Sequence, residues 1–199
     1  MNIIWHGHSC FEITGKDGTI VFDPYQANSV PGLNSLKLKA NLVLCSHEHD
    51  DHNARNCVEV APKDFKVTCI ETYHDHHQGS HRGKNTIHIV DFENLKVVHM
   101  GDIGCMMDDV SKLKNCDVLM IPIGGYYTID TKEALKYIER IQPRIVIPMH
   151  YHSHEFGYDV LSTNEEFIQQ SSNIVYVDDY LEVHKETKGQ TIVFKKPRN

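Results

Sequence analysis

A run of seven residues, Ser46-His47-Glu48-His49-Asp50-Asp51-His52, constrains the fold more than any other part of the chain. It contains the pattern H-x-H-x-D-H and directly follows the apolar segment 42–45, which we expect to be a short strand buried on both faces. Side chains two residues apart point to the same side of an extended segment but to nearly opposite sides of a helix. The pattern therefore predicts an extended or loop segment at a strand end, where three imidazoles and a carboxylate converge.

This convergence predicts a metal site. A hard or borderline divalent cation is the species that makes a cluster of imidazoles and a carboxylate favourable. A solvated histidine-rich loop is the alternative, but such a loop has no reason to follow a buried strand directly. We expect Asp51 and His52 to open a helix after the motif, because an acidic residue is favoured in a first helical turn.

Three further candidate ligands each follow an apolar, strand-like segment. His74 comes after 67–70, Asp102 after 96–100 and His150 after 144–147. Loops at the carboxyl ends of strands are where sheet proteins commonly place their sites. Two ions about 3.5–4 Å apart could hold a hydroxide between them for hydrolysis. One ion would be bound by His47, His49 and His74 and the other by Asp51, His52 and His150, with Asp102 bridging the two.

The rest of the chain has a strand-rich first part and a second part in which strands alternate with helices. Strands are predicted at 2–6, 9–14, 18–22, 42–45, 67–70, 86–90, 96–100, 117–121, 144–147, 174–177, 180–184 and 191–195. Helices are predicted at 132–141, capped by Thr131, and at 163–170, which opens with a resemblance to a capping box. No linker or repeat divides the chain. We therefore expect one domain over 1–199, an α/β (α+β) fold with mixed sheets covered by helices.

Composition excludes some classes of protein. The 199 residues include 20 basic and 27 acidic side chains, a net charge of −7, which disfavours a general nucleic-acid binder. No apolar run approaches the roughly 18 residues of a membrane span. No signal peptide is visible at the N-terminus, and the six cysteines form no CxxC pair. We expect a cytoplasmic protein with reduced thiols.

Further short stretches match a known family. They are Trp5 to Phe11, Phe22 to Pro24, Tyr73 to Asp75 with Arg82 to Asn85, Gly101-Asp102, Pro122 to Gly125 and Ile147 to His150. With these, the chain resembles, over essentially its whole length, metal-dependent hydrolases of the metallo-β-lactamase fold. It looks closest to a short branch that includes bacterial proteins similar to L-ascorbate-6-phosphate lactonase. The resemblance implies a four-layered αββα sandwich with a dinuclear site on one edge. It also supports the same ligands, namely His47, His49, Asp51, His52, His74, Asp102 and His150.

Other residues are assigned to the surroundings of this site. His8 falls at a family position close to the metals, so we expect His8 and Asp51 to be the catalytic residues. Asp23 is expected to lie at the substrate or to orient a ligand histidine by accepting its second N–H, with a simple Asp-Pro turn as the alternative. Arg82 and Tyr127 are expected to contact substrate, although a solvated basic turn would equally explain Arg82. The roles of four more histidines stay open: His76, His77 and His81 could each replace His74, and His152 could lie at the pocket rim.

The expected function is hydrolysis of an ester-type bond, a lactone or a phosphoester, in a small molecule by a hydroxide held between two divalent ions. Zn²⁺ is the first expectation, and Mn²⁺ or Fe²⁺ would also suit these ligands. The length leaves no room for the added domains of thioesterase and RNA-processing relatives. Two alternatives are a di-iron redox or oxygen-handling protein on the same scaffold and a non-catalytic metal-binding protein. Expected partners are a small-molecule substrate but no nucleic acid or membrane, and homo-oligomerisation stays open.

Overall fold

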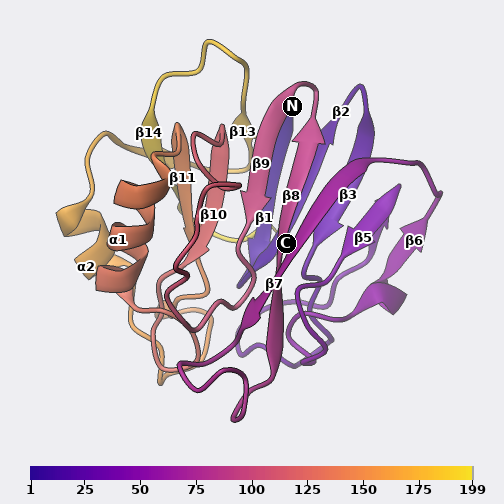
Figure 1. Cartoon of the computed structure of the whole chain (residues 1–199). Helices are drawn as coiled ribbons and strands as arrows, with labels where there is room; N and C mark the ends of the chain where they lie inside the picture. The colour runs from indigo at the N-terminus through magenta and orange to yellow at the C-terminus, as the bar shows by residue number, and fades with distance from the viewer. Residues whose placement is uncertain (199) are drawn as a thin grey trace.

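Two large β-sheets packed face to face form the centre of the computed structural model, which describes residues 1–198 (Figure 1). The strands are β1 (Asn2–Gly7), β2 (Cys10–Gly15), β3 (Gly18–Phe22), β4 (Leu38–Ala40), β5 (Leu42–Leu44), β6 (Val58–Val60), β7 (Lys66–Tyr73), β8 (Lys84–Phe92), β9 (Leu95–His99), β10 (Val118–Pro122), β11 (Ile145–Met149), β12 (Ile174–Val177), β13 (Leu181–Glu182) and β14 (Gln190–Phe194). One sheet has five strands in the order β13-β1-β2-β3-β5, and the other has seven in the order β12-β14-β11-β10-β9-β8-β7. All the predicted strands are present, whereas β4 and β6 were not predicted.

The main core lies between these sheets. Trp5, Phe11 and Phe22 enter it from the five-stranded sheet, and Ile87 and Phe92 enter it from the seven-stranded sheet. Strands β10 and β11 are buried at every residue, because they are central parallel strands covered on both faces.

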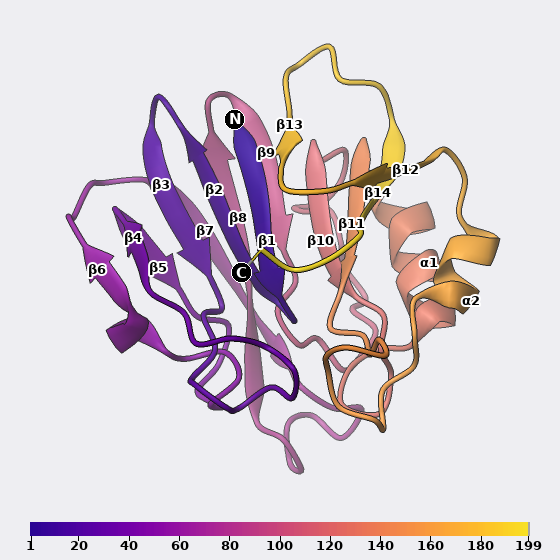
Figure 2. The ribbon, with the colours of Figure 1, turned by 180° about the vertical axis from the view of Figure 1, so that it is seen from behind.

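The two α-helices of residues 1–198 lie beside β10, β11 and β14 in both views (Figures 1 and 2). Helix α1 (Thr131–Ile141) buries Ala134, Tyr137 and Ile141, and a shorter helix, α2 (Glu165–Gln170), packs near it. The prediction that Thr131 caps α1 is wrong by one residue. Asp130 is the N-cap, because its carboxylate accepts a hydrogen bond from the Glu133 N–H (2.9 Å) while the Glu133 side chain accepts from the Asp130 N–H (3.2 Å).

The outer face of the five-stranded sheet is covered differently from the expected helix layer. In the described residues, this cover consists of the pair β4–β6, loops and the short 3₁₀ helix η1 (Arg55–Cys57). The helix expected to open at Asp51 and His52 is therefore absent, and these two residues lie in a turn. A second apolar cluster fills the space beneath the cover, formed by Cys10, Val21, Tyr25, Val30, Ala40 and Val58. The prediction of full burial for 42–45 was also wrong, since β5 is a half-buried edge strand.

Strand directions bring the carboxyl ends of several strands to one edge of the sandwich. Strands β9, β10 and β11 run parallel, and β7 has the same direction because β8 is antiparallel to both β7 and β9. In the other sheet β3 and β5 are parallel, and β1 shares their direction. Within residues 1–198, no helix is both long enough and apolar enough to cross a membrane.

Candidate metal centre

The predicted ligands come together at this edge. His47, His49, Asp51 and His52 lie in the loop after β5, and His74, Asp102 and His150 follow β7, β9 and β11. His8 joins them from the turn between β1 and β2. Three non-glycine residues here have left-handed backbones, namely His8 (φ 53°), Asp23 (φ 42°) and His150 (φ 52°). Such backbone strain is typical of sites whose surroundings hold a side chain in one direction.

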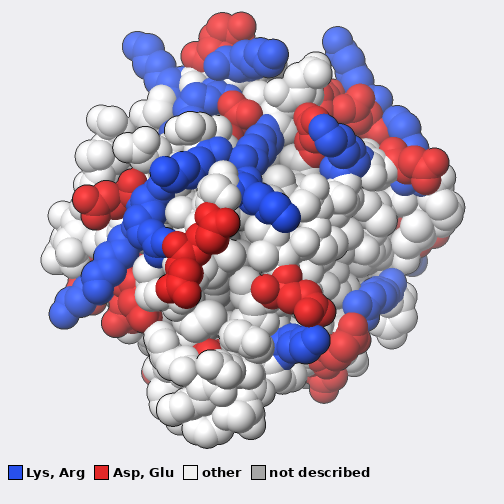
Figure 3. Space-filling model, in the orientation of Figure 1, with Lys and Arg blue, Asp and Glu red and all other residues white. Residues whose placement is uncertain are grey.

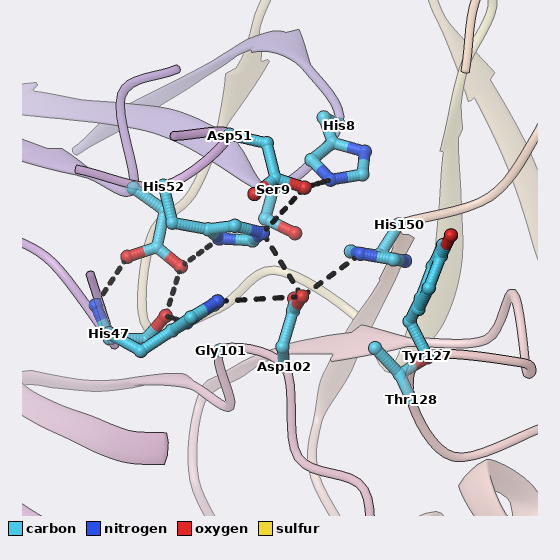
Figure 4. Close-up of polar contacts among 12 residues, drawn as sticks. His8, Ser9, His47, Asp51, His52, Gly101, Asp102, Tyr127, Thr128 and His150 are labelled. Carbon is cyan, nitrogen blue, oxygen red and sulfur yellow. Dashed lines mark hydrogen bonds and ion pairs between the residues drawn. The ribbon is translucent and has the colours of Figure 1, made fainter. Parts of the chain in front are cut away.

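Asp102 is the centre of the cluster (Figure 4). Its Oδ2 atom lies 3.0 Å from Nε2 of His150 and 3.1 Å from Nε2 of His52. The Nε2 atoms of His74 and His47 are 3.4 Å and 3.9 Å from the same oxygen. One carboxylate oxygen therefore faces four imidazole nitrogens from three loops, those after β5, β7 and β11.

The ligand atoms fall into three groups. His47, His49 and His74 form one group, and Asp51, His52 and His150 form another together with His8. A third group, His47, His52 and Asp102, connects the first two. The atoms of each group lie within 4.8 Å of one another, which suits a shared cation. His74 is part of the first group, whereas His76, His77 and His81 are in none of the three.

Three buried atoms at the centre of the cluster have no hydrogen-bond partner within residues 1–198. They are Nε2 of His47, Nε2 of His52 and Oδ1 of Asp102. Unpartnered buried polar atoms cost free energy, and a divalent cation is the partner that would satisfy two imidazole lone pairs and a carboxylate oxygen together. The residues present therefore fit a metal.

The charge states of the cluster also fit cation binding. Burial, reinforced by the neighbouring His52, lowers the pKa of His47 to about 3, so its imidazole is neutral at pH 7. Burial also lowers the pKa of His74. Burial opposes ionisation of Asp102, but His150 and His52 hold its pKa well below the ordinary range. His47 and His74 thus present neutral imidazoles beside an ionised carboxylate, the protonation states that metal ligands require. Burial opposes protonation of His52, but Asp102 and Asp51 raise its pKa, so a cation bound there would displace a proton.

A layer of acceptors behind the ligands fixes their orientation. Nδ1 of His52 donates to Oδ2 of Asp23 at 2.9 Å, and Nδ1 of His74 donates to the Tyr127 carbonyl oxygen at 3.0 Å. Ser46 links Asp23 to His47, since its Oγ lies 2.6 Å from Oδ2 of Asp23 and 2.8 Å from Nδ1 of His47. These contacts turn Nε2 of each ring toward the centre.

Asp23 itself is fully buried and accepts from the Ser46 N–H, the Ser46 hydroxyl and His52. The predicted substrate contact for Asp23 is therefore wrong, and the orienting role is the one its position supports. His8, predicted as catalytic, lies with Nε2 3.2 Å from Oδ2 of Asp51. Burial, followed by the charge of His150, lowers the pKa of His8 to about 4.

The two other predicted substrate contacts lie at the rim. Tyr127 is half-buried beside His150 (Figure 4), and the Arg82 guanidinium carbon lies 5.1 Å from the centre of its ring. His152, for which a place at the pocket rim stays a prediction, is half-buried, and its Nε2 lies 3.4 Å from Oδ1 of Asp159.

Sequence reasoning assigned no role to two residues of the site. Ser46 stood within the quoted motif, and its place before the first histidine could have indicated an orienting hydroxyl. The Tyr158 hydroxyl donates to the Ser29 carbonyl oxygen (2.7 Å) and lies 3.3 Å from Oδ2 of Asp51. No sequence pattern near Tyr158 predicts its contact with Asp51.

Comparison with known proteins agrees with this geometry. Residues 2–150 match the family described as "Beta-lactamase superfamily domain". The chain belongs to this superfamily. As a metallo-β-lactamase-fold protein it has the expected fold, and the loop-built layer over β1–β5 is a variation within that fold.

Sequence relatives identify a narrower family for this metallo-β-lactamase-fold chain. A "UPF0173 metal-dependent hydrolase" of Staphylothermus marinus is 30% identical, with 74% of this chain and 82% of the relative covered. Another, from Thermoplasma acidophilum, is 28% identical and covers 83% and 88%. The chain is therefore a metal-dependent hydrolase of the UPF0173 family.

Solved structures agree in architecture. A candidate Zn-dependent hydrolase of the metallo-β-lactamase superfamily from Thermotoga maritima has a TM-score of 0.78 at 26% identity, with 97% of each chain covered. A metallo hydrolase from Ignicoccus hospitalis has a TM-score of 0.62 at 19% identity, covering 85% of this chain and 89% of its own. The second likeness concerns the fold alone.

Proposed function

We propose that this hydrolase binds two divalent cations and cleaves an ester-type bond, a lactone or a phosphoester, in a small molecule. The observation that carries the proposal is the central position of Asp102, whose Oδ2 lies within 3.9 Å of four imidazole Nε2 atoms. The two ligand groups on either side of Asp102 give each ion its own set of donors. Zn²⁺ suits a set dominated by imidazoles, and Mn²⁺ or Fe²⁺ suits the carboxylates as well.

Divalent ions held in this way lower the pKa of bound water and polarise the bond to be cleaved. The protein residues supply position and proton handling. Asp23 and Ser46 hold His52 and His47 in place, and the Tyr127 carbonyl holds His74. His8 and Asp51 share a hydrogen bond of 3.2 Å at the border of the cluster, where a proton released or taken up during hydrolysis can pass.

The surface supports a small-molecule substrate. Basic and acidic side chains are interspersed on the face seen in Figure 3, and the chain carries a net charge of −7. Nucleic-acid binding needs a continuous basic face. The narrower resemblance to lactonase-like proteins stays a prediction, which a lactone substrate would test directly.

The test is an activity screen of the Zn²⁺- and Mn²⁺-loaded protein against lactones, phosphodiesters, phosphomonoesters and thioesters. We expect turnover of a lactone or a phosphoester. Asp51→Ala and His52→Ala should each lower kcat by at least about a hundredfold, because each removes a donor from a two-metal site. Asp50→Asn is the matched control, since Asp50 is an exposed carboxylate of the same loop outside the ligand groups.

Normal rates in both ligand variants would disprove the proposal. Oxygen consumption by the iron-loaded protein, with no hydrolysis in the zinc- or manganese-loaded protein, would favour the di-iron redox alternative instead.

A further inference from the structure

Arg82 lies at the rim of the metal centre with its guanidinium against two aromatic rings. The guanidinium carbon is 5.1 Å from the centre of the Tyr127 ring and 5.8 Å from that of Tyr126. Contacts of this kind hold a cation through the negative face of the ring and leave its N–H donors available. Tyr126 is 64% exposed, so this arrangement faces open space rather than the core.

The backbone of Arg82 is held as firmly as its side chain. Oδ2 of Asp75 accepts from the N–H groups of His81 (3.0 Å) and Arg82 (2.8 Å), and its Oδ1 accepts from those of His77 (2.7 Å) and Gly79 (2.9 Å). One carboxylate therefore organises the whole loop between β7 and β8. Little conformational entropy remains for Arg82 to lose when it binds a ligand.

The charge of Arg82 is not neutralised within the described part of the chain. No carboxylate of residues 1–198 lies within ion-pair distance of its guanidinium, whereas the neighbouring Lys84 is 3.3 Å from Glu71. The overall charge of −7 gives anions no general attraction to this protein. Any anion drawn to the rim must therefore be drawn by a local cation.

Aromatic side chains connect Arg82 to the metal ligands. The ring of Tyr127 is 6.0 Å from that of Tyr158, whose hydroxyl lies 3.3 Å from Oδ2 of Asp51. The Tyr127 carbonyl holds His74 on the other side. A substrate reaching from the metal centre along these two rings would arrive at the guanidinium.

We propose that the substrate carries an anionic oxygen group, a carboxylate or a phosphoryl group, that binds Arg82 while the bond to be cleaved lies at the metal centre. This inference rests on the proposed hydrolase function and names its substrate class. A guanidinium presents paired N–H donors that match the oxygens of both groups.

Binding can be tested without turnover by isothermal titration calorimetry of the Zn²⁺-loaded protein. The probes are matched pairs of equal length, namely butyrate with succinate, pentanoate with glutarate and hexanoate with adipate. Both members of a pair offer one carboxylate to the metals, and only the second member offers another to Arg82. Inorganic salt is kept constant at low concentration, because screening weakens exposed charges. In a further arm, 3-phosphonopropionate replaces succinate and shows which anionic group is preferred.

We expect at least one dicarboxylate to bind about tenfold more tightly than its monocarboxylate partner. Arg82→Gln should reduce this ratio to below about twofold, and the matched control Lys84→Gln should leave it unchanged. A ratio below about twofold in every wild-type pair, or a ratio that Arg82→Gln leaves intact, would overturn the inference.

The two proposals can fail separately. The protein could prefer dianions through Arg82 and yet hydrolyse none of the screened esters. That result would support the anion subsite at Arg82 and reject the proposed ester hydrolysis. Hydrolysis of a screened ester without any dianion preference would support the proposed ester hydrolysis and reject the anion subsite at Arg82.

Discussion

Oδ2 of Asp23 lies 2.9 Å from Nδ1 of His52, although 29 residues separate the two in the sequence. Burial opposes ionisation of Asp23, but His99 and His52 hold its pKa far below the ordinary range. An ionised carboxylate can only accept, so Nδ1 of His52 carries the hydrogen. The other nitrogen, Nε2, is left facing Oδ2 of Asp102 at 3.1 Å.

Asp23→Asn should therefore weaken metal binding by about 10- to 100-fold. An amide in this position can donate as well as accept, so it no longer requires the hydrogen to stay on Nδ1 of His52. The measurement is competition of the Zn²⁺-loaded protein with a chromophoric chelator. Asp91→Asn serves as control, because Asp91 is an exposed carboxylate paired with Lys66. Equal zinc affinity in the wild type and the Asp23 variant would show that Asp23 does not orient the ligand.

Tyr158→Phe should lower kcat/KM about tenfold and leave the fold intact. The Tyr158 hydroxyl lies 3.3 Å from Oδ2 of Asp51, so its removal frees Asp51 to turn away from the metal centre. Steady-state kinetics on whichever ester the wild type hydrolyses would measure the change. Tyr176→Phe is the control, since Tyr176 is an exposed tyrosine of β12. Unchanged kinetics in Tyr158→Phe would make the contact incidental.

His88→Leu should reduce the loss of stability in acid. Burial lowers the pKa of His88 to about 4, with a smaller contribution from His99. Below about pH 6.5 the unfolded chain therefore binds a proton that the folded chain does not, and stability falls as the pH drops toward 4. Over this window His88 alone accounts for up to about 3 kcal/mol of unfolding free energy.

The measurement is urea unfolding between pH 7 and pH 4.5 in the presence of chelator, so that metal release does not contribute. The slope of unfolding free energy against pH should be shallower in His88→Leu than in the wild type. The difference should correspond to close to one fewer proton taken up on unfolding. His154→Gln, which changes an exposed histidine, should keep the wild-type slope. Parallel slopes for all three proteins would contradict the assignment of His88 as a buried neutral group.

Elements with strong local signals could be predicted from the sequence, and those held by distant partners could not. Short strand-like runs separated by turn residues predict β1 to β3 and the hairpin between β2 and β3, and the apolar face of 132–141 predicts α1. Strands β4 and β6 are three residues each and pair across 20 positions, so no local pattern marks them. The helix expected after His52 fails because residues 50–54 hold turns that bond to Pro24, Gln26 and His49 instead.

The metal ligands were predictable for a similar reason. Each stands at the end of an apolar strand, and the strand directions bring these ends together without further information. The supporting contacts were not predictable at this level. Asp23 reaches the ligands through a backbone with φ 42°, and Tyr158 reaches Asp51 from 107 positions away. The spacing of residues in the sequence does not predict such contacts.

Asp75→Ala should loosen the rim loop that carries Arg82. The Asp75 carboxylate accepts four backbone N–H groups between His77 and Arg82, and alanine would leave all four to water. We expect a loss of about 1–3 kcal/mol in unfolding free energy, because the loop is largely exposed and water can replace part of the lost bonding.

Trypsin should then cleave after Arg82 sooner in the variant than in the wild type, since proteolysis requires a mobile backbone. The dicarboxylate preference should weaken at the same time, because Arg82 is no longer fixed against Tyr127. Asp109→Ala is the control, since Asp109 is exposed and accepts from only one backbone N–H, that of Ser111. Unaltered cleavage after Arg82 in Asp75→Ala would mean that packing of Arg82 on the two tyrosines is enough to hold the loop.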